Sequence, residues 1–499
     1  MCSSFEAIKM PLSGKHLRKR PASQALGLDT FPFNNVEEDD PFSNMSCEAE
    51  PCADDDERLG LDEHADADER LRLDERLPDG PRCSAQCFQW PQSFGSRMCG
   101  ELGPHYVLNA LGKVHWHVHT LFSGMGCPEV ALAMLRAGVR NIGPDFSTLE
   151  IDINVSGISL DKNPECRKVL KNNYGDRCMF GDVQDFVASG QTLDKIKFKT
   201  CCHCYTHNQD CPLAPSRQEG VASVMVAGPP CTPWSKRGKR QGNKDPQAHT
   251  HIIWAKYVLE NKIDLVVFDC VYDDEVLRNV LEFFGKDYTI RHAKVSAFGL
   301  GYCVSRERLY VIMVRHQSDF KWTSEKSLEE MLKPLLSRTV MKLADTFMLS
   351  NQEVQGNTDS PYAAKVEKDF NKSEAKHFQM YKEKFPGKLL WDLSQNPNFS
   401  ATTELKNGAL PALTTNCRSL YSTQMKRTMT AAELLLNQGI PVTETAARAA
   451  NVSRLEFPVS ASAMVRMAGN GMHVPSVGAI LLLAMLHITR KEDEVQGRP

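Results

Sequence analysis

The sequence predicts an α/β fold in which a parallel, doubly wound sheet is interrupted by a second, smaller domain. Short apolar runs, typical of buried strands, alternate with helical patterns from residue 101 onward. The alternation stops over residues 316–425, which are polar with scattered aromatics, and it resumes in apolar C-terminal helices. We therefore expect a sheet domain at 101–315, a smaller domain at 316–425, and helices at 426–490 that complete the sheet domain.

Each expected strand is an apolar run that a loop and a helical pattern follow. Strands of a parallel sheet are buried on both faces, so they read as continuous apolar runs rather than as alternating ones. The predicted strands cover residues 114–122, 156–160, 221–227, 265–269 and 308–314. The predicted helices cover residues 129–137, 164–173, 249–261, 274–284, 430–436 and 474–486.

The composition excludes several classes of protein. With 41% hydrophobic and 24% charged residues in 499, the chain can bury a core and is neither fibrous nor disordered throughout. The 17 Cys are too few for a disulfide scaffold, and no apolar signal segment opens the chain. The apolar run at 477–486 is too short to cross a bilayer. We expect reduced thiols, no membrane association, and a location in the nucleus in a eukaryote or in the cytoplasm otherwise.

The net charge of −3 conceals an acidic segment. Residues 36–80 hold 18 Asp and Glu against 4 Lys and Arg, which leaves the rest of the chain at +11. We expect residues 1–100 to be a disordered tail containing this acidic stretch. The basic cluster at 15–20 fits a nuclear import signal, although such clusters also arise by chance.

A glycine-containing loop at 122–126 follows the first predicted strand and precedes a helix. Gly124 and Gly126 let the backbone turn tightly and approach a ligand at the helix N-terminus. Asp161 ends the next strand, where a carboxylate can accept hydrogen bonds from a ribose diol. Glu129 stands where a phosphate-binding motif has its third Gly, which disfavours NAD and favours S-adenosylmethionine. The alternative is a plain strand–helix turn.

The loop at 226–235 presents Cys231 at the carboxyl end of a predicted strand and is stiffened by three Pro. Open α/β sheets keep their sites at this end of the strands. The basic residues that follow at 236–240 favour a thiolate, the nucleophilic form of Cys. Together with Trp234 they can also contact nucleic-acid phosphates. The alternative is a structural Cys in a rigid loop.

Six motifs, in order, resemble those of the cytosine carbon-5 DNA methyltransferase family. The loop at 122–126 is similar to its first cofactor motif, Asp161 and Asp182 to its acidic cofactor contacts, and Pro230-Cys231 to its catalytic dipeptide. Residues 305–310 resemble its Gln-x-Arg-x-Arg motif. Residues 427–441 resemble the segment that closes its target-recognition domain, and Gly469-Asn470-Gly471 resembles its final motif.

The resemblance implies a sheet typical of S-adenosylmethionine-dependent methyltransferases, a target-recognition domain at 316–425, and double-stranded DNA as the partner. Asp161 and Asp182 stand where the family contacts the ribose and the adenine of the cofactor. The cofactor-binding residues that the resemblance implies are Phe122, Ser123, Gly124, Gly126, Asp161, Asp182, Pro229 and Asn470.

The resemblance also implies a mechanism. The Cys231 thiolate adds to carbon 6 of a flipped-out cytosine, Asp269 protonates ring nitrogen 3, and carbon 5 takes the methyl group from S-adenosylmethionine. Arg306 hydrogen-bonds the carbonyl of the base, and Arg308 is the second Arg of the same motif.

This sequence departs from the family pattern at two motifs. The acid motif Glu-Asn-Val reads Asp269-Cys270-Val271, and Val304 replaces the Gln of Gln-x-Arg-x-Arg. The shorter Asp269 predicts a slow but functional enzyme. Two alternatives stay open: an RNA (tRNA) cytosine-5 methyltransferase, whose Cys-Phe-Thr signature is absent here, and a catalytically inactive DNA-binding homologue.

An inserted segment at 198–220 holds four candidate zinc ligands in the spacing Cys-x2-Cys-x2-His-x3-Cys. They are Cys201, Cys204, His207 and Cys211. The spacing is tighter than in typical zinc knuckles, and unconstrained thiols are the alternative.

Overall fold

The computed structural model describes residues 77–175, 177–215, 217–235, 240–350, 352–354, 360–415, 417 and 419–492. The basic cluster at 15–20, the acidic stretch up to residue 76 and the basic residues at 236–239 lie outside the described residues.

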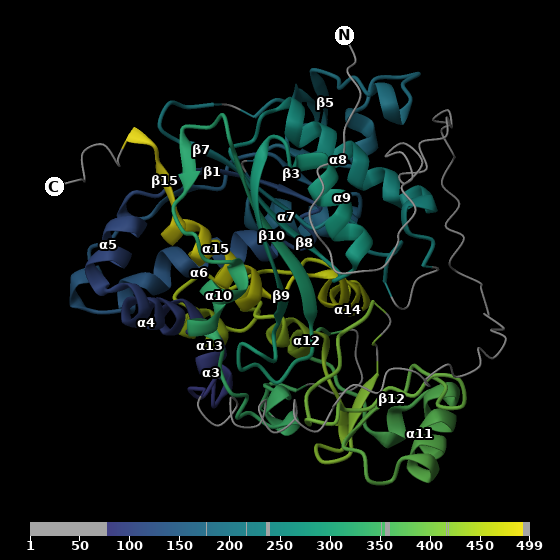
Figure 1. The fold of residues 1–499 in the computed structure, drawn as a ribbon. Coiled ribbons are helices and arrows are strands. Elements are labelled where there is room, and N and C mark those ends of the chain that lie inside the picture. Colours follow the sequence, from purple (N-terminus) through teal and green to yellow (C-terminus); the bar gives the residue numbers. More distant parts are fainter. Residues whose placement is uncertain are drawn as a thin grey trace, which may run out of the picture.

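The centre of the molecule is a mixed sheet in the order β4-β3-β1-β7-β8-β10-β9, with β2 also paired to β1 (Figure 1). Its strands are β1 His115–Leu121, β2 Asp152–Asn154, β3 Ser159–Leu160, β4 Met179–Phe180, β7 Ala222–Ala227, β8 Leu265–Cys270, β9 Tyr288–Ser296 and β10 Glu307–Arg315. All five predicted strands are present. The α/β class is thereby confirmed, with a sheet that is mostly but not wholly parallel.

Strand β10 runs antiparallel to both of its neighbours, β8 and β9. Strand β9 was not predicted, because partly exposed and charged positions such as Lys294 break the apolar run expected of a buried strand. Residues 297–306 join β9 to β10 without a helix, and neighbouring strands joined in this way run antiparallel.

Helices cover both faces of the sheet, and alternate residues of each central strand serve the two sides. In β7, Val224 and Val226 belong to the hydrophobic core that includes α6 Cys127–Gly138 and α15 Val474–His487. Met225 and Ala227 belong to the core that includes α8 His249–Glu260 and α9 Asp274–Phe284. This period of two shows that the sheet is doubly wound.

Order begins earlier than the predicted residue 101. Helices α3 Ser84–Cys87, α4 Trp90–Leu102 and α5 Pro104–Gly112 precede β1. Trp90, Phe94 and Met98 recur at a spacing of four, which puts them on one face of α4, and all three are buried. This helical period was readable in the sequence. The expected tail of 1–100 is therefore wrong for its last residues.

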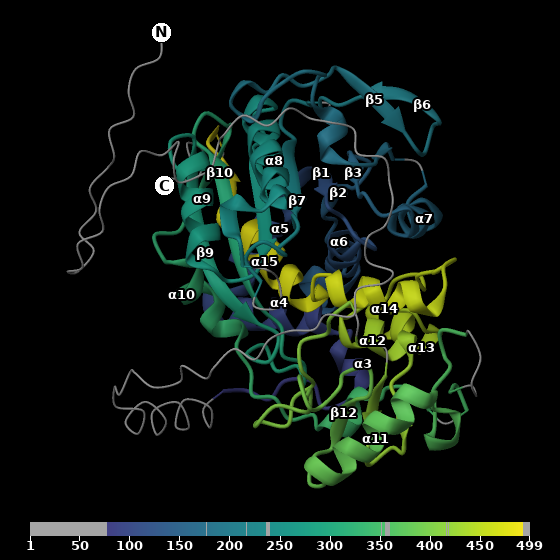
Figure 2. The same ribbon diagram turned by 90° about the vertical axis from the view of Figure 1, so that its right-hand side faces the viewer.

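A small subdomain lies at one end of the molecule, away from the sheet (Figure 2). It consists of α11 Lys372–Lys384 and the three-stranded sheet β12 Leu390–Asp392, β13 Leu420–Ser422 and β14 Arg427–Thr428. Its separate core is mainly aromatic and consists of Phe378, Tyr381, Trp391, Leu393 and Tyr421. Residues 316–350 pack instead on the main core, through Leu328, Leu332 and Leu335 among others.

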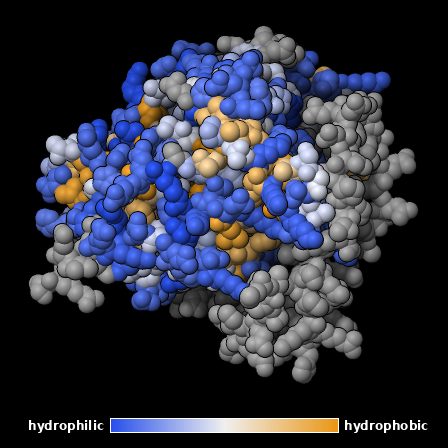
Figure 3. Space-filling view, turned by 90° about the horizontal axis from the view of Figure 1, so that it is seen from above, coloured by the Kyte–Doolittle hydropathy of each residue, from blue (hydrophilic) through white to orange (hydrophobic). Residues whose placement is uncertain are grey.

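Five elements not yet named precede the small subdomain: α7 Pro164–Asn173, β5 Cys201–Cys204, β6 Gln209–Pro212, β11 Phe320–Trp322 and α10 Leu328–Leu332. After the subdomain the chain returns to the sheet domain with α12 Ala431–Asn437, α13 Glu444–Ala450, α14 Ala461–Asn470 and β15 Ile488–Arg490. Strand β15 pairs with β11, which fixes the C-terminal segment beside the end of β10. The surface seen from above is mainly hydrophilic with small apolar patches (Figure 3), because helices bury both faces of the sheet.

Within the described residues, no single helix is long and apolar enough to cross a membrane. The bent pair α14 and α15 passes the same test by length and composition, and α15 is buried along its whole length.

Candidate active site

The carboxyl ends of the parallel strands β1, β3, β4, β7 and β8 meet at one edge of the sheet. Most of the predicted site residues lie at this edge, because they end a strand or belong to the loop that follows it, whereas Arg306 and Arg308 lie around the start of the antiparallel β10 and Asn470 ends α14. This edge is where open α/β sheets bind ligands.

The loop after β1 has the backbone that its glycines predict. Phe122, Gly124 and Gly126 all have positive φ angles, of 58°, 55° and 94°. The Gly124 N–H donates to Asp161 Oδ2 at 2.7 Å, and the Asn163 N–H donates to Asp161 Oδ1 at 2.8 Å. Burial raises the pKa of the Asp161 carboxyl, and the two backbone donors oppose that shift. Asp161 thus connects the loop at 122–126 to the loop that follows β3.

A buried ion pair lies under this loop. Arg177 Nη1 is 2.6 Å from Glu129 Oε1, and neither side chain is more than 1% exposed. Thr120 Oγ1 donates to Glu129 Oε1 at 2.6 Å and accepts from Arg177 Nη2 at 2.8 Å. Ser123 Oγ donates to the Thr120 carbonyl at 2.7 Å, which ties the loop to this network. Neither the role of Glu129 in this ion pair nor Arg177 was predicted from the sequence.

Asp182 follows β4 and caps the short helix Val183–Phe186, since its Oδ1 accepts from the Gln184 N–H at 3.0 Å. Asp182 Oδ2 lies 3.3 Å from Lys162 Nζ, so an ion pair connects Asp182 to the residue that follows Asp161. A Cβ on Gly181 would lie 3.2 Å from Tyr205 Cε2, which places this ring beside Asp182. Tyr205 comes from the inserted segment and was not predicted.

The Gly469-Asn470-Gly471 motif ends α14 beside the same loop. A Cβ on Gly471 would lie 2.5 Å from Met125 Cε and 3.1 Å from Cys127 Sγ, so this glycine packs closely against the loop at 122–126 and the start of α6. The close approach places the exposed Asn470 near the loop at 122–126, as its predicted cofactor contact requires.

The Pro-Pro-Cys loop is held from three sides. His251 Nε2 donates to the Pro230 carbonyl at 3.0 Å; burial lowers the pKa of His251 to about 4, so its ring is neutral near pH 7. The Trp234 and Ser235 N–H groups donate to the Cys231 carbonyl at 3.1 and 3.0 Å. The Trp234 indole donates to Glu275 Oε2 at 3.0 Å. Pro229 is buried, whereas Cys231 is partly exposed. No sequence pattern marked His251 or Glu275.

The four predicted catalytic side chains come together. The charges of Arg308, Asp269 and Cys231 all act on the Arg306 guanidinium, and burial lowers its pKa to about 10, so it stays protonated near pH 7. Arg306 Nη1 donates to the Gly469 carbonyl at 3.3 Å. A Cβ on Gly228 would lie 3.8 Å from Asp269 Oδ2, so this carboxyl adjoins the start of the Pro-Pro-Cys loop.

Two buried polar atoms in this cluster lack a hydrogen-bond partner among the described residues. They are Asp269 Oδ1 and Arg306 Nε. Burial raises the pKa of the Asp269 carboxyl, while the charges of Arg308 and Arg306 and the hydroxyl of the neighbouring Tyr310 oppose that shift. The two atoms offer a hydrogen-bond acceptor and a hydrogen-bond donor to the polar edge of a bound molecule.

The departures from the family pattern have structural consequences. Val304 is buried and forms an isolated bridge with Leu410, so an apolar side chain stands where the family has Gln. Cys270 is also buried and adjoins Cys231, and burial raises the pKa of the Cys270 thiol.

The predicted zinc ligands are brought together in part. Cys204, His207 and Cys211 form one cluster, but its fourth member is Cys178 rather than Cys201. Cys201 is exposed and takes no part, because successive side chains of β5 point to opposite faces.

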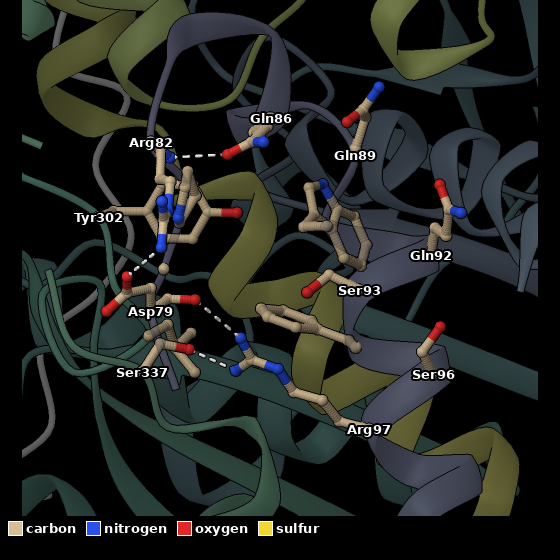
Figure 4. A pocket seen from close by; sticks show the side chains of 15 residues that line it. Asp79, Arg82, Gln86, Gln89, Gln92, Ser93, Ser96, Arg97, Tyr302 and Ser337 are labelled. Atoms are coloured by element: carbon tan, nitrogen blue, oxygen red, sulfur yellow. Dashed lines mark hydrogen bonds and ion pairs between the residues drawn. The ribbon is translucent and has the colours of Figure 1, made fainter. Parts of the chain in front are cut away.

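A polar cavity of about 480 Å³ lies elsewhere, between α4 and the loop around Tyr302 (Figure 4). Arg97 points across it and donates to the Leu335 carbonyl at 3.1 Å, to the Asp79 carbonyl at 3.3 Å and to Ser337 Oγ. These bonds connect parts of the protein itself. None of the predicted site residues lines this cavity, so it is not the candidate active site.

The family model of the C-5 cytosine-specific DNA methylases matches residues 121–482, a span that contains every candidate catalytic and cofactor-binding residue. The chain belongs to this family. Membership implies methyl transfer to carbon 5 of cytosine with S-adenosylmethionine. The glycine loop, Asp161 and the close approach at Gly471 fit an adenosine-containing cofactor of this kind.

Several solved structures resemble the chain, all at low identity. A putative DNA modification methyltransferase from a prophage of E. coli is 16% identical, with a TM-score of 0.47 over 74% of this chain and 98% of that one. The S. pombe Dnmt2 methyltransferase is 14% identical, with a TM-score of 0.43 over 74% and 98%. The Entamoeba histolytica methyltransferase EhMeth is 12% identical, with a TM-score of 0.41 over 74% and 98%. No curated protein matches the chain.

Proposed function

We propose that the protein methylates carbon 5 of cytosine in double-stranded DNA through a covalent adduct between Cys231 and a flipped-out base. One observation carries this proposal: the partly exposed Cys231 belongs to one charge cluster with the buried Asp269 carboxyl and the buried Arg306 guanidinium. Cytosine offers the matching edge, because ring nitrogen 3 accepts a proton and the neighbouring carbonyl accepts a hydrogen bond.

The Cys231 thiolate adds to carbon 6, and the electrons of the carbon 5–carbon 6 double bond move toward carbon 5. Asp269 donates its proton to ring nitrogen 3, for which its raised pKa suits it, because a buried carboxyl keeps its proton to higher pH. Arg306 donates a hydrogen bond to the carbonyl of the base, and Arg308 adds positive charge beside it. S-adenosylmethionine supplies the methyl group. Carbon 5 then gives up its proton to solvent, the bond to Cys231 breaks to regenerate the thiolate, and ring nitrogen 3 returns its proton to Asp269.

We assign cofactor binding to the loops that follow β1, β3 and β4 at the carboxyl edge of the sheet. Asp161 accepts from the ribose and Asp182 from the adenine, with Asn470 closing the site from α14. The backbone at Phe122, Ser123, Gly124, Gly126 and Pro229 forms its walls. The buried Ser123 hydroxyl already donates to Thr120, so Ser123 shapes the loop rather than offering its side chain.

We further propose that the small subdomain around α11 recognises the target, and that the protein acts in the nucleus if its source is a eukaryote. Exposed lysines of α11, including Lys372, Lys376 and Lys384, suit contact with phosphates. The family description names DNA as the substrate of its members, and the tRNA-specific Cys-Phe-Thr signature is absent from the sequence.

A transfer assay with radiolabelled S-adenosylmethionine tests the substrate. We expect label in a cytosine-containing DNA duplex and none in tRNA, and we expect no transfer by Cys231→Ala. Label in tRNA alone would establish the RNA alternative. No transfer to either substrate, with the cofactor still bound in calorimetry, would establish an inactive binding protein.

A further inference from the structure

Four potential metal ligands converge from two separate segments of the chain. Cys178 directly precedes β4, whereas Cys204, His207 and Cys211 belong to the β5–β6 hairpin, at the opposite end of the molecule from the small subdomain (Figure 2). His207 Nδ1 lies 3.7 Å from Cys178 Sγ, 3.4 Å from Cys204 Sγ and 3.3 Å from Cys211 Sγ. All four ligand atoms lie within 4.8 Å of one another.

These distances fit a tetrahedral zinc site. Zn–S bonds of about 2.3 Å and Zn–N bonds of about 2.05 Å give tetrahedral edges of about 3.6 Å from nitrogen to sulfur and about 3.8 Å between sulfurs. Hydrogen bonds alone do not explain the arrangement, because one ring nitrogen has either one proton or one lone pair and cannot serve three sulfurs. A single cation at the centre accounts for all three contacts.

The strand geometry determines which Cys can take part. In β5, Cys202 and Cys204 face the interior while Cys201 and His203 are exposed. Cys202 lies two residues before Cys204 on the same face of β5, but its thiol donates to the Asp185 carbonyl at 3.1 Å and is not part of the cluster. The cross-strand register pairs Cys202 with Cys211 and directs Cys211 inward too. The ligand missing from the hairpin is therefore supplied by Cys178.

The surroundings of Cys204 also suit a bound thiolate. The Met179 N–H donates to Cys204 Sγ at 3.3 Å, and the backbone N–H groups of Thr206 and His207 face the same sulfur. Hydrogen bonds of this kind stabilise the charge of a metal-bound sulfur and orient it.

We propose that Cys178, Cys204, His207 and Cys211 bind one Zn²⁺. Three thiolates and one imidazole fill a four-coordinate site, which leaves no position for substrate, so the role of the metal is structural. The zinc fastens the inserted hairpin to the sheet just before Gly181 and Asp182.

Tyr205 lies between two of these ligands and connects the metal to the cofactor site. Its N–H donates to the Met179 carbonyl at 2.8 Å, and its ring stands against Gly181. The Arg167 guanidinium covers the ring at 4.0 Å from its centre. Loss of zinc is therefore expected to loosen the contact of Tyr205 with Gly181, the residue that precedes Asp182. This second part of the inference rests on the proposed cofactor site, whereas the zinc itself does not.

The metal content of the full-length protein tests the zinc site, with Cys201→Ser as the matched control for Cys178→Ser. We expect one zinc per chain by mass spectrometry of metals in the parent and in Cys201→Ser, and none in Cys178→Ser. Cys178→His, which keeps a ligand, should retain zinc and guards against misfolding of the Ser variant. Zinc retained by Cys178→Ser, zinc lost from Cys201→Ser, or a disulfide with no zinc in the parent would overturn the proposal.

The same protein tests the link to the cofactor. We expect removal of zinc from the parent by a chelator to weaken S-adenosylmethionine binding about tenfold in calorimetry, or about 1.4 kcal/mol, with recovery on adding zinc. Unchanged affinity in the zinc-free protein would refute the link through Tyr205 and leave the zinc site standing. Absence of cofactor binding in the zinc-loaded parent would instead refute the proposed cofactor site.

Discussion

Replacement of Asp269 by Ala is expected to slow methyl transfer about 10²–10⁴-fold and to leave the affinity for S-adenosylmethionine unchanged. The carboxyl is 7% exposed, lies beside Gly228 and acts on Arg306, and burial raises its pKa. Its loss removes the proton donor to the base without touching the loop at 122–126. Single-turnover methylation, together with calorimetry of cofactor binding, separates these two effects.

Two further variants sharpen this test. Asp269→Glu should match or exceed the parent rate, because its carboxyl extends further toward the base and restores the residue type of the family. Asp273→Ala serves as the control: Asp273 caps α9 through the Glu275 N–H at 2.9 Å, so its loss should affect stability and not the rate. If Asp269→Ala methylates as fast as the parent, the acid is another residue, with Asp273 and Asp274 the next candidates.

Replacement of Arg177 by Ala is expected to lower the free energy of unfolding by about 3–5 kcal/mol. The change leaves the Glu129 carboxylate buried without its cation, in a network that also holds Thr120 and the cofactor loop. Equilibrium unfolding in urea measures the loss. Glu129→Gln, which keeps the shape of the side chain, should also destabilise the protein and provides a second measurement if the Ala variant does not fold.

An exposed ion pair supplies the matched control. Lys326 and Glu101 lie 3.0 Å apart with side chains 57% and 41% exposed, so Lys326→Ala should change the free energy of unfolding by no more than about 1 kcal/mol. A loss below about 1 kcal/mol for Arg177→Ala as well would show that the buried network does not stabilise the sheet edge.

The sequence located helices better than it located strand directions. Helices α7 and α9 have the bounds that the sequence predicted, and the structure shows Asn163 and Asp273 capping their starts. Periodicity contains no information about direction, so the antiparallel course of β10 was not foreseen. That course depends on the edge strand β9, whose exposed positions hid it.

The site residues at the carboxyl ends of parallel strands could be predicted from the sequence. Asp161, Cys231 and Asp269 meet because parallel strands bring their carboxyl ends to one edge. Arg177 and His251 were missed, because their roles depend on contacts between elements distant in sequence. Cys201 was chosen on spacing alone, which ignores the alternation of side chains along β5, while Cys178 lies too far back in the chain for any spacing rule.

Covalent trapping at Cys231 tests the central claim most directly. A cytosine with fluorine at carbon 5 cannot lose a proton after methylation, so the bond to the attacking sulfur persists. With a DNA duplex containing this base and S-adenosylmethionine, we expect a denaturation-resistant adduct that peptide mass spectrometry locates at Cys231 and that Cys231→Ser abolishes. An adduct at another residue, or methylation of ordinary duplex by Cys231→Ser at the parent rate, would contradict the account.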